Sequence, residues 1–185
     1  HMLLEVNSPK TSERNYGHSV QKKVLLSLET ADKELTELTG LFQESKNIKF
    51  SELNLKSQYP YYIFKNGELI YWSDHRYIPN HEWIKGMLED GLLARDNHIN
   101  LVKKQVFYYK ASKLELVSLI PIYKKYRNEN DYLKSEFDKD IFPTSPLTIE
   151  NKASQVTYLN IHDPKQLFLF SVVPPRLENL NVPEV

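Results

Sequence analysis

The sequence contains no cysteine, and only five of its 185 residues are glycine. Without thiols there is no disulfide bond, no thiolate zinc site and no cysteine nucleophile. The few glycines form neither the GxGxxG nor the GxxxxGK[ST] pattern that binds nucleotide phosphates. The GxSxG and HExxH motifs of serine and zinc hydrolases are missing too. No positive feature points to an enzyme, so we predict no catalytic residue, no metal site and no cofactor.

An excess of one charge is also lacking. Lys and Arg together number 24, as do Asp and Glu, so the formal net charge is zero. Proteins that bind nucleic acids usually carry a clear basic excess, because the neutralisation of phosphates drives their affinity. The balance of charge therefore argues against DNA or RNA as a partner.

The sequence shows no signal peptide and no apolar run of the roughly 18–20 residues needed to span a bilayer. Its first two residues, His1 and Met2, are typical of an affinity-tag remnant and a start codon. We therefore expect the chain to be a fragment, with any membrane anchors of the parent protein outside it.

Aromatic residues are abundant, with twelve tyrosines and eight phenylalanines. The hydrophobic fraction of 41% is sufficient for one globular domain with its own core. The histidines are scattered and show no spacing suited to a metal ion. His75 and His81 lie near Asp74, but a solvated loop explains them better than a metal site.

A long amphipathic helix is predicted for residues 3–50. Its apolar residues recur at heptad spacing: Val24, Leu28, Ala31, Leu35, Leu38 and Phe42. About 30 helical residues make a rod of roughly 45 Å. Ser12 or Asn15 is a candidate N-cap, and Lys46-Asn47 is a candidate end. Two arrangements remain open and can coexist: the C-terminal half packs on a sheet, and the N-terminal half protrudes and pairs with a second copy.

A tight hairpin is expected after the long helix. Tyr61–Phe64 and Glu68–Trp72 are short aromatic and β-branched runs, separated by Lys65-Asn66-Gly67. Asn and Gly both accept the positive φ angles of a two-residue hairpin turn. The pattern therefore predicts two antiparallel strands at this point.

A second, longer hairpin is predicted from Leu101–Lys110 and Leu114–Tyr123, joined near Ala111-Ser112. Pro121 lacks an N–H group, so we expect an edge or a bulge near the end of its strand.

Two short helices are expected beside these hairpins. The first begins at Pro79-Asn80, ends before Gly91 and directs four residues to one face: Trp83, Ile84, Met87 and Leu88. The second begins at Asn128 and directs three residues inward: Tyr132, Leu133 and Phe137.

The chain closes with predicted strands at Gln155–Ile161 and Gln166–Val173, which turn at Asp163-Pro164. Adjacent strands with short turns imply an antiparallel sheet. The expected fold class is α+β: a long N-terminal helix packed on an antiparallel sheet, with short helices. Residues 51–173 would form the sheet domain, and residues 174–185 an extended tail.

Trp72 is the first candidate ligand-binding residue. A large aromatic side chain at a strand end, followed by Ser73-Asp74, is suited to line a concave site with an apolar wall and a polar rim. In the simpler alternative, Trp72 fills the core while Ser73 and Asp74 cap the next turn.

A second candidate site groups Tyr109 with Tyr123 and Lys124. If Tyr108-Tyr109 faces Tyr123, Lys124 and Tyr126 across the long hairpin, one face forms an aromatic cup with a cationic rim. Such a cup suits a small anionic ligand. The alternative is ordinary sheet packing with lysines extended toward solvent.

Two segments carry a resemblance to a known family. Gly67–Asp74 resembles the hairpin motif G-x-L-x-Y-W-S-D of Bacteroidetes-type sensor histidine kinases. Leu119–Tyr126, continued by Asn130–Phe137, resembles the L-I-P-I-K-x-x-Y…N-x-Y-L-x-x-x-F segment of the same family. The motifs lie about fifty residues apart, and the resemblance covers roughly Gln58–Phe170.

The resemblance implies the fold of Cache/PDC sensor domains, a long helix laid on an antiparallel, PAS-like sheet. It also implies flanking transmembrane helices, a position on the extracytoplasmic (periplasmic) face of the bacterial inner membrane, and a cytoplasmic dimeric kinase. The expected function is an input domain for a small molecule or a periplasmic protein, dimeric in the full-length receptor. A protein-interaction or structural module without a small ligand is the alternative, followed by a hydrolase.

Overall fold

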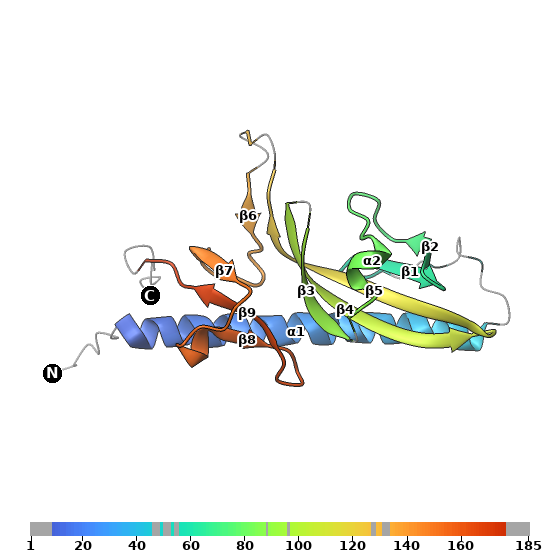
Figure 1. Ribbon diagram of the computed structural model, residues 1–185, viewed down its shortest axis with the longest axis horizontal. Helices are drawn as coiled ribbons and strands as arrows, with labels where there is room; N and C mark the ends of the chain where they lie inside the picture. The colour runs from blue at the N-terminus through green and yellow to red at the C-terminus, as the bar shows by residue number, and fades with distance from the viewer. Residues whose placement is uncertain are drawn as a thin grey trace. The chain divides into compact units, whose positions relative to one another are not determined.

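The computed structural model describes most of the chain, in these ranges: 9–45, 49, 53, 56–87, 89–95, 97–126, 129–130 and 134–176. The fold is α+β, with one long helix and antiparallel sheets, as expected (Figure 1). The chain divides into two compact units. The larger unit comprises residues 26–126, and the smaller unit comprises residues 1–25 and 127–185.

The predicted long helix is present as α1, Pro9–Glu44. All six residues of its predicted apolar seam are at most 2% exposed. The helix begins before Ser12 and Asn15, so neither caps it; Pro9 suits the first turn, where its missing N–H has no helical partner. The predicted end at Lys46-Asn47 lies outside the described residues.

The N-terminal half of α1 belongs to the smaller unit and is covered there. Val20 is fully buried, and the Tyr16 hydroxyl donates to the Thr144 carbonyl at 2.7 Å. The Gln21 amide exchanges two hydrogen bonds with the His162 backbone, at 2.8 and 2.9 Å. The expectation that this half protrudes and pairs with a second copy is therefore wrong for the seam between Tyr16 and Val24, because the chain's own C-terminal segment already covers it.

The larger unit contains a sheet of strands β1 to β5 in the order β2-β1-β5-β4-β3, with all neighbours antiparallel. The strand bounds are as follows: β1 Tyr61–Lys65, β2 Glu68–Trp72, β3 Asp90–Arg95, β4 His98–Tyr109 and β5 Ser112–Lys124. Both predicted hairpins are confirmed. Their turns place Asn66 at φ 50° and Gly67 at φ 86°, and Lys110 and Ala111 at 47° and 62°.

The predicted irregularity at Pro121 is confirmed as a bulge. Asn100 of β4 pairs with Pro121, whereas the preceding residue, Ile99, pairs with Tyr123. Ile122 is thus left without a partner in β4, and the register shifts by one residue. Proline is tolerated at such a point because the ladder does not need its missing N–H group.

The first short helix is only partly as predicted. Asn80 does cap α2, His81–Ile84, and its Oδ1 accepts from the Glu82 N–H at 3.0 Å. The helix stops well before Gly91, which lies inside β3 instead of ending the helix. Strand β3 was not predicted. Of the inward-facing residues expected here, Leu88 lies outside the described residues.

The smaller unit holds a separate three-stranded sheet, so the expectation of a single sheet is wrong. Its strands run in the order β7-β9-β8, with these bounds: β7 Thr148–Glu150, β8 Asn160–His162 and β9 Phe168–Val173. The predicted turn is confirmed, since Asp163 Oδ1 accepts from the N–H groups of Lys165 and Leu167 at 2.9 and 2.8 Å.

Two predictions in the smaller unit are wrong. The first part of Gln155–Ile161 is not a strand but a bend followed by the 3-10 turn η2, Thr157–Leu159. Phe137 lies in the short strand β6, Glu136–Phe137, and not in a helix. The rest of that predicted helix, Asn128, Tyr132 and Leu133, lies outside the described residues. No regular structure follows β9 as far as Arg176, as predicted for the proline pair after it.

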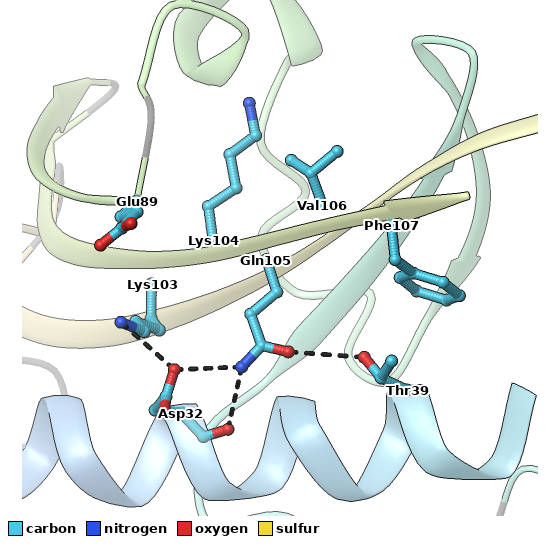
Figure 2. A pocket seen from close by; sticks show the side chains of 8 residues that line it. All are labelled: Asp32, Thr39, Glu89, Lys103, Lys104, Gln105, Val106 and Phe107. Atoms are coloured by element: carbon cyan, nitrogen blue, oxygen red, sulfur yellow. Dashed lines mark hydrogen bonds and ion pairs between the residues drawn. The ribbon is translucent and has the colours of Figure 1, made fainter. Parts of the chain in front are cut away.

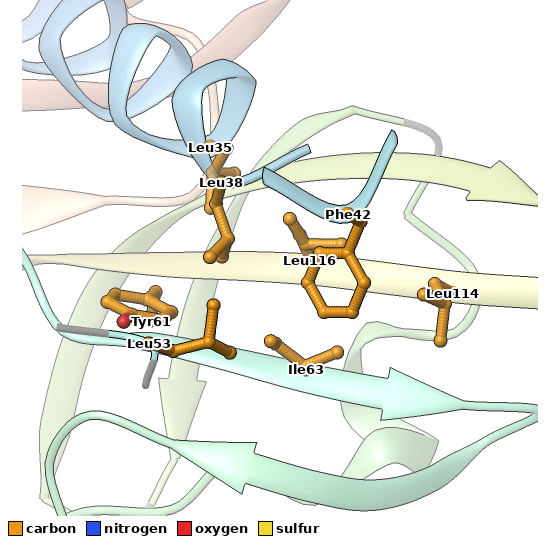
Figure 3. Close-up of a cluster of buried hydrophobic side chains, with 8 residues drawn as sticks. All are labelled: Leu35, Leu38, Phe42, Leu53, Tyr61, Ile63, Leu114 and Leu116. Atoms are coloured by element: carbon orange, nitrogen blue, oxygen red, sulfur yellow. The ribbon is translucent and has the colours of Figure 1, made fainter. Parts of the chain in front are cut away.

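The sheet of the larger unit is packed on both faces. Figure 3 shows the cluster on the first face, where α1 meets β1 and β5: Leu35, Leu38, Phe42, Leu53, Tyr61, Ile63, Leu114 and Leu116. The cluster on the opposite face includes Ile84 of α2: Tyr62, Phe64, Ile84, Leu93, Val102, Val117 and Leu119. Successive residues of a strand point to opposite faces, so the same strands supply both clusters.

Candidate functional site

A pocket of about 550 Å³ lies between α1 and β4 within the larger unit (Figure 2). It is lined by side chains from both elements and from the residue before β3: Asp32, Thr39, Glu89, Lys103, Lys104, Gln105, Val106 and Phe107. Lys103, Gln105 and Phe107 alternate along β4 and point toward α1. We call these residues the helix–strand pocket.

Gln105 connects the strand to the helix. Its amide Nε2 donates to Asp32 Oδ1 at 3.0 Å, to the Asp32 carbonyl at 3.2 Å and to Thr36 Oγ1 at 3.0 Å. Its Oε1 lies 3.4 Å from the Thr39 hydroxyl. One side chain therefore joins successive turns of α1 to the middle of β4.

Lys103 supplies a positive charge on the α1 side of the pocket. Its Nζ lies 3.0 Å from Asp90 Oδ1 and 3.2 Å from Asp32 Oδ1. Burial alone would lower the pKa of Lys103, but the two carboxylates outweigh it and hold the pKa above its ordinary value. Lys103 therefore stays charged and bridges the edge strand β3 to helix α1.

The pocket combines a polar floor with one apolar wall. The Asp32 carboxylate lies within hydrogen-bonding reach of both the Lys103 ammonium group and the Gln105 amide, and Phe107 supplies the aromatic surface. Such a lining suits a small polar ligand whose groups replace some of these bonds. Within the described ranges, no three His, Asp or Glu residues are placed to hold a metal ion.

A cluster of buried charges lies on the other face of the same sheet. Glu115 of β5 accepts from His81 Nε2 at 2.9 Å and lies 2.6 Å from Lys104 Nζ. Lys104 also donates to the carbonyls of Ile84 and Met87, at 3.3 and 3.1 Å. We call Glu115, Lys104 and His81 the buried charge cluster. It ties α2 and the turn after it to strands β4 and β5.

Electrostatics keep the buried carboxylate ionised. Burial would raise the pKa of Glu115, but the hydrogen-bonded Lys104 and His81 outweigh it and hold the pKa below its ordinary value. The sequence interpretation of His81 as part of a solvated loop is therefore wrong. Its ring packs 5.2 Å from the Phe64 ring and serves the core of this face.

Trp72 lies at the end of β2 with 46% of its surface exposed, so it does not fill the core. Ser73 closes the hairpin, since its N–H donates to the Tyr61 carbonyl at 2.9 Å and its hydroxyl accepts from the Tyr61 N–H at 2.8 Å. Asp74 binds Arg76 through both carboxylate oxygens, which lowers the pKa of Asp74 to about 2. The Ser-Asp pair thus shapes the turn, as the simpler alternative holds, while Trp72 stays at the surface.

Tyr109 packs in the core that faces α1. Its ring meets Phe42 edge to face at 5.7 Å, and its hydroxyl donates to the Ser45 carbonyl at 3.0 Å. Tyr108 is 74% exposed, on the opposite face of the sheet. The two adjacent tyrosines therefore do not share one surface.

Tyr123 and Lys124 lie at the far end of the long hairpin from Tyr109. Lys124 pairs with His98, whereas Tyr109 pairs with Ser112 beside the turn. At about 3.3 Å per strand residue, these ends are roughly 35 Å apart. The expectation that they form one aromatic cup is wrong, because the turn fixes a register that separates them. Lys124 lies over the Tyr126 ring instead, at 5.3 Å.

None of the residues predicted from the sequence lines the helix–strand pocket. Asp32, Lys103 and Gln105 were missed, because charged residues beside an apolar seam are usually solvated. One signal was present, since Lys103-Lys104-Gln105 interrupts an otherwise apolar strand with three consecutive polar residues. Lys103 and Gln105 point to one face of the strand and Lys104 to the other, so at least one of them points to a buried face whichever way the strand is turned, and such a residue needs a partner.

No protein-family model matches the chain, and no match is found among curated proteins or among solved structures. Among the residues that the structure describes, no helix has the length and apolar character needed to cross a membrane.

Proposed function

We propose that this chain is the extracytoplasmic input domain of a membrane-bound sensor histidine kinase, and that it detects a small polar ligand in the helix–strand pocket. The motifs at Gly67–Asp74 and Leu119–Tyr126 support the family, with its implied Cache/PDC-like fold. A long helix packed on an antiparallel sheet agrees with that fold. The observation that carries the proposal is that the pocket is shared by α1 and β4.

A shared pocket allows a ligand to act on the helix. Gln105 and Lys103 bind Asp32 directly, so the helix and the strand are held by polar bonds across the pocket. A ligand that replaces these bonds favours a different packing of α1 on the sheet. A coupling of about 1–3 kcal/mol between ligand and packing changes populations about 5–150-fold. In the receptor, this helix would continue from the first membrane span.

The ligand site is tested by a thermal-shift screen of small polar metabolites with the chain and two variants. Gln105→Ala removes the central amide of the pocket, and Gln155→Ala removes an exposed amide elsewhere. A ligand that raises the melting temperature of the wild-type chain should stabilise Gln155→Ala equally and Gln105→Ala less. Equal stabilisation of all three proteins would place the ligand elsewhere and contradict the site.

The receptor role is tested separately, by sequencing the parent reading frame on both sides of this segment. A span of about 20 apolar residues on each side, followed by a kinase, is the expected result. Polar flanks on both sides would overturn the membrane-receptor proposal. They would leave the pocket, and a ligand bound there, unaffected.

A second candidate function, a protein-interaction module, is favoured by one observation. Val106 and Tyr108 expose apolar side chains side by side on β4, at 43% and 74% of their surface. Apolar strand surface of this kind is typical of protein contacts.

A further inference from the structure

The outer edge of β4 has no partner strand over its last residues, within the described part of the chain. β3 pairs with β4 only as far as Lys103, and the last bond on this side runs from the Lys104 N–H to the Glu89 carbonyl, at 2.8 Å. In an antiparallel strand, every second residue directs its N–H and C=O to the same side. Val106 and Tyr108 therefore direct their backbone groups outward, as Lys104 does.

The open part of this edge contains no charged residue, no proline and no bulge. Natural edge strands are blunted by charged side chains, proline or a bulge. The segment Gln105–Tyr109 has no charged residue and no proline, and it pairs with β5 without interruption. The opposite edge strand, β2, is different: Glu68 lies in it, and its pairing with β1 contains an irregularity. The edge of β4 is therefore open to pairing with another strand.

We infer that a second copy of this chain covers the edge, with the two β4 strands pairing antiparallel about a two-fold axis at Phe107. In this register Val106 of each copy lies opposite Tyr108 of the other. Both residues direct their backbone groups outward, so each pair exchanges N–H to C=O hydrogen bonds in both directions. The same residues of both copies therefore form the two sides of the interface, as two-fold symmetry requires.

The exposed side chains support the same register. Val106 and Tyr108 lie on one face of the sheet, and a β-branched residue opposite an aromatic one is a favourable cross-strand pair. Gln105–Tyr109 contains no charged side chain, and Lys104 of each copy lies opposite Lys110 of the other in this register. Lys104, next along the strand, already has its charge compensated by Glu115 at 2.6 Å.

The inference goes beyond the sensing role and does not depend on it. It does place the second copy beside the helix–strand pocket, because Gln105, Val106 and Phe107 line that pocket and also belong to the open edge. Failure of the dimer would leave the ligand screen valid, and failure of the screen would leave the dimer intact.

Sedimentation velocity of the whole chain over a concentration series tests the association. Val106→Lys and Tyr108→Lys introduce the charge that blocks strand edges, and each should weaken the dimer at least about tenfold. Leu167→Lys is the matched control, because it replaces a side chain that is 63% exposed in the smaller unit. It should leave the dimer unchanged. At dilutions where the wild-type chain is monomeric, all three variants should keep its melting temperature, since the replaced side chains lie at the surface.

The register is tested by disulfide formation between introduced cysteines. The chain has no native cysteine, so no other disulfide can form. Directly opposite residues have Cα atoms about 5.5 Å apart, within the range of about 4.4–6.8 Å that a disulfide spans. A mixture of Val106→Cys and Tyr108→Cys chains should therefore form a cross-linked heterodimer under mild oxidation. Each variant alone should not, because identical positions are offset by two residues and lie roughly 8 Å or more apart.

Four results would overturn the inference. The first is a wild-type chain that stays monomeric up to about 1 mM, where even weak association is detectable. The second is a dimer that both lysine variants leave intact. The third is cross-linking of the single variants as readily as of the mixture, which would show another register. A monomer that instead binds an unrelated extended peptide at this edge would also reject a second copy as the occupant.

Discussion

Glu115 is the residue on which the α2-facing side of the sheet depends most. It is 1% exposed, and its carboxylate compensates Lys104, which is 3% exposed. Two buried opposite charges gain little over a well-packed apolar pair, but one of them left alone is strongly unfavourable. The cluster therefore makes the structure sensitive to the loss of either partner.

We predict that Glu115→Gln lowers the free energy of unfolding at pH 7 by about 3–5 kcal/mol, because it leaves the Lys104 ammonium buried without a counter-charge. Urea unfolding measures the loss. Glu37→Gln is the control: it makes the same chemical change on the exposed face of α1 and should cost less than about 0.5 kcal/mol. Equal stability of the two variants would show that Lys104 does not need Glu115.

The same variant also tests how much Glu115 contributes to the loss of folding stability at low pH. Its pKa in the folded chain is below the ordinary value of 4.5, so its stabilising effect is complete above pH 4.5. The effect is lost as the pH falls below 4.5 and through the lowered pKa. Urea unfolding at pH 7 and pH 3 should therefore show a smaller loss for Glu115→Gln than for wild type. An identical loss in both proteins would exclude Glu115 as a source of acid sensitivity.

Among the helices and strands, the elements predicted correctly are those whose structure is determined by residues close together in the sequence. The heptad seam of α1 and the Asn66-Gly67 turn need no knowledge of the rest of the chain, and both are present. Strand β3 was missed because Leu92-Leu93 is too short an apolar run to separate strand from helix by period. The helix–strand pocket was missed because it joins Asp32 to Gln105, and sequence spacing does not show which distant polar residues meet.

The first hairpin yields a prediction at this scale. Gly67 has φ 86°, so Gly67→Ala should destabilise the chain by about 1–2 kcal/mol through backbone strain. The added Cβ would otherwise meet only the His81 ring, at 3.4 Å. Gly40→Ala is the control, because Gly40 is helical and its new Cβ meets nothing within 4 Å. That change should instead stabilise the chain by about 0.5–1 kcal/mol. Urea unfolding measures the change in the free energy of unfolding for both variants and shows which one is destabilised.

For the whole molecule, the decisive feature is that one helix supplies buried residues to both compact units. Val20 and Val24 are fully buried in the smaller unit, and Leu35 and Leu38 in the larger one. Helix formation is cooperative, so loss of order in one part of α1 weakens the turns that follow. We therefore expect the two units to unfold in one transition, although each has its own sheet.

The two tryptophans allow this expectation to be tested, because Trp72 and Trp83 both lie in the larger unit. Val20→Ala leaves a cavity in the smaller unit and should cost on the order of 2 kcal/mol. If the units unfold together, the urea midpoint from tryptophan fluorescence shifts as much as the midpoint from circular dichroism. A fluorescence midpoint that stays at the wild-type value, while circular dichroism shows an earlier loss of helix, would establish that the units unfold independently and that α1 does not couple them.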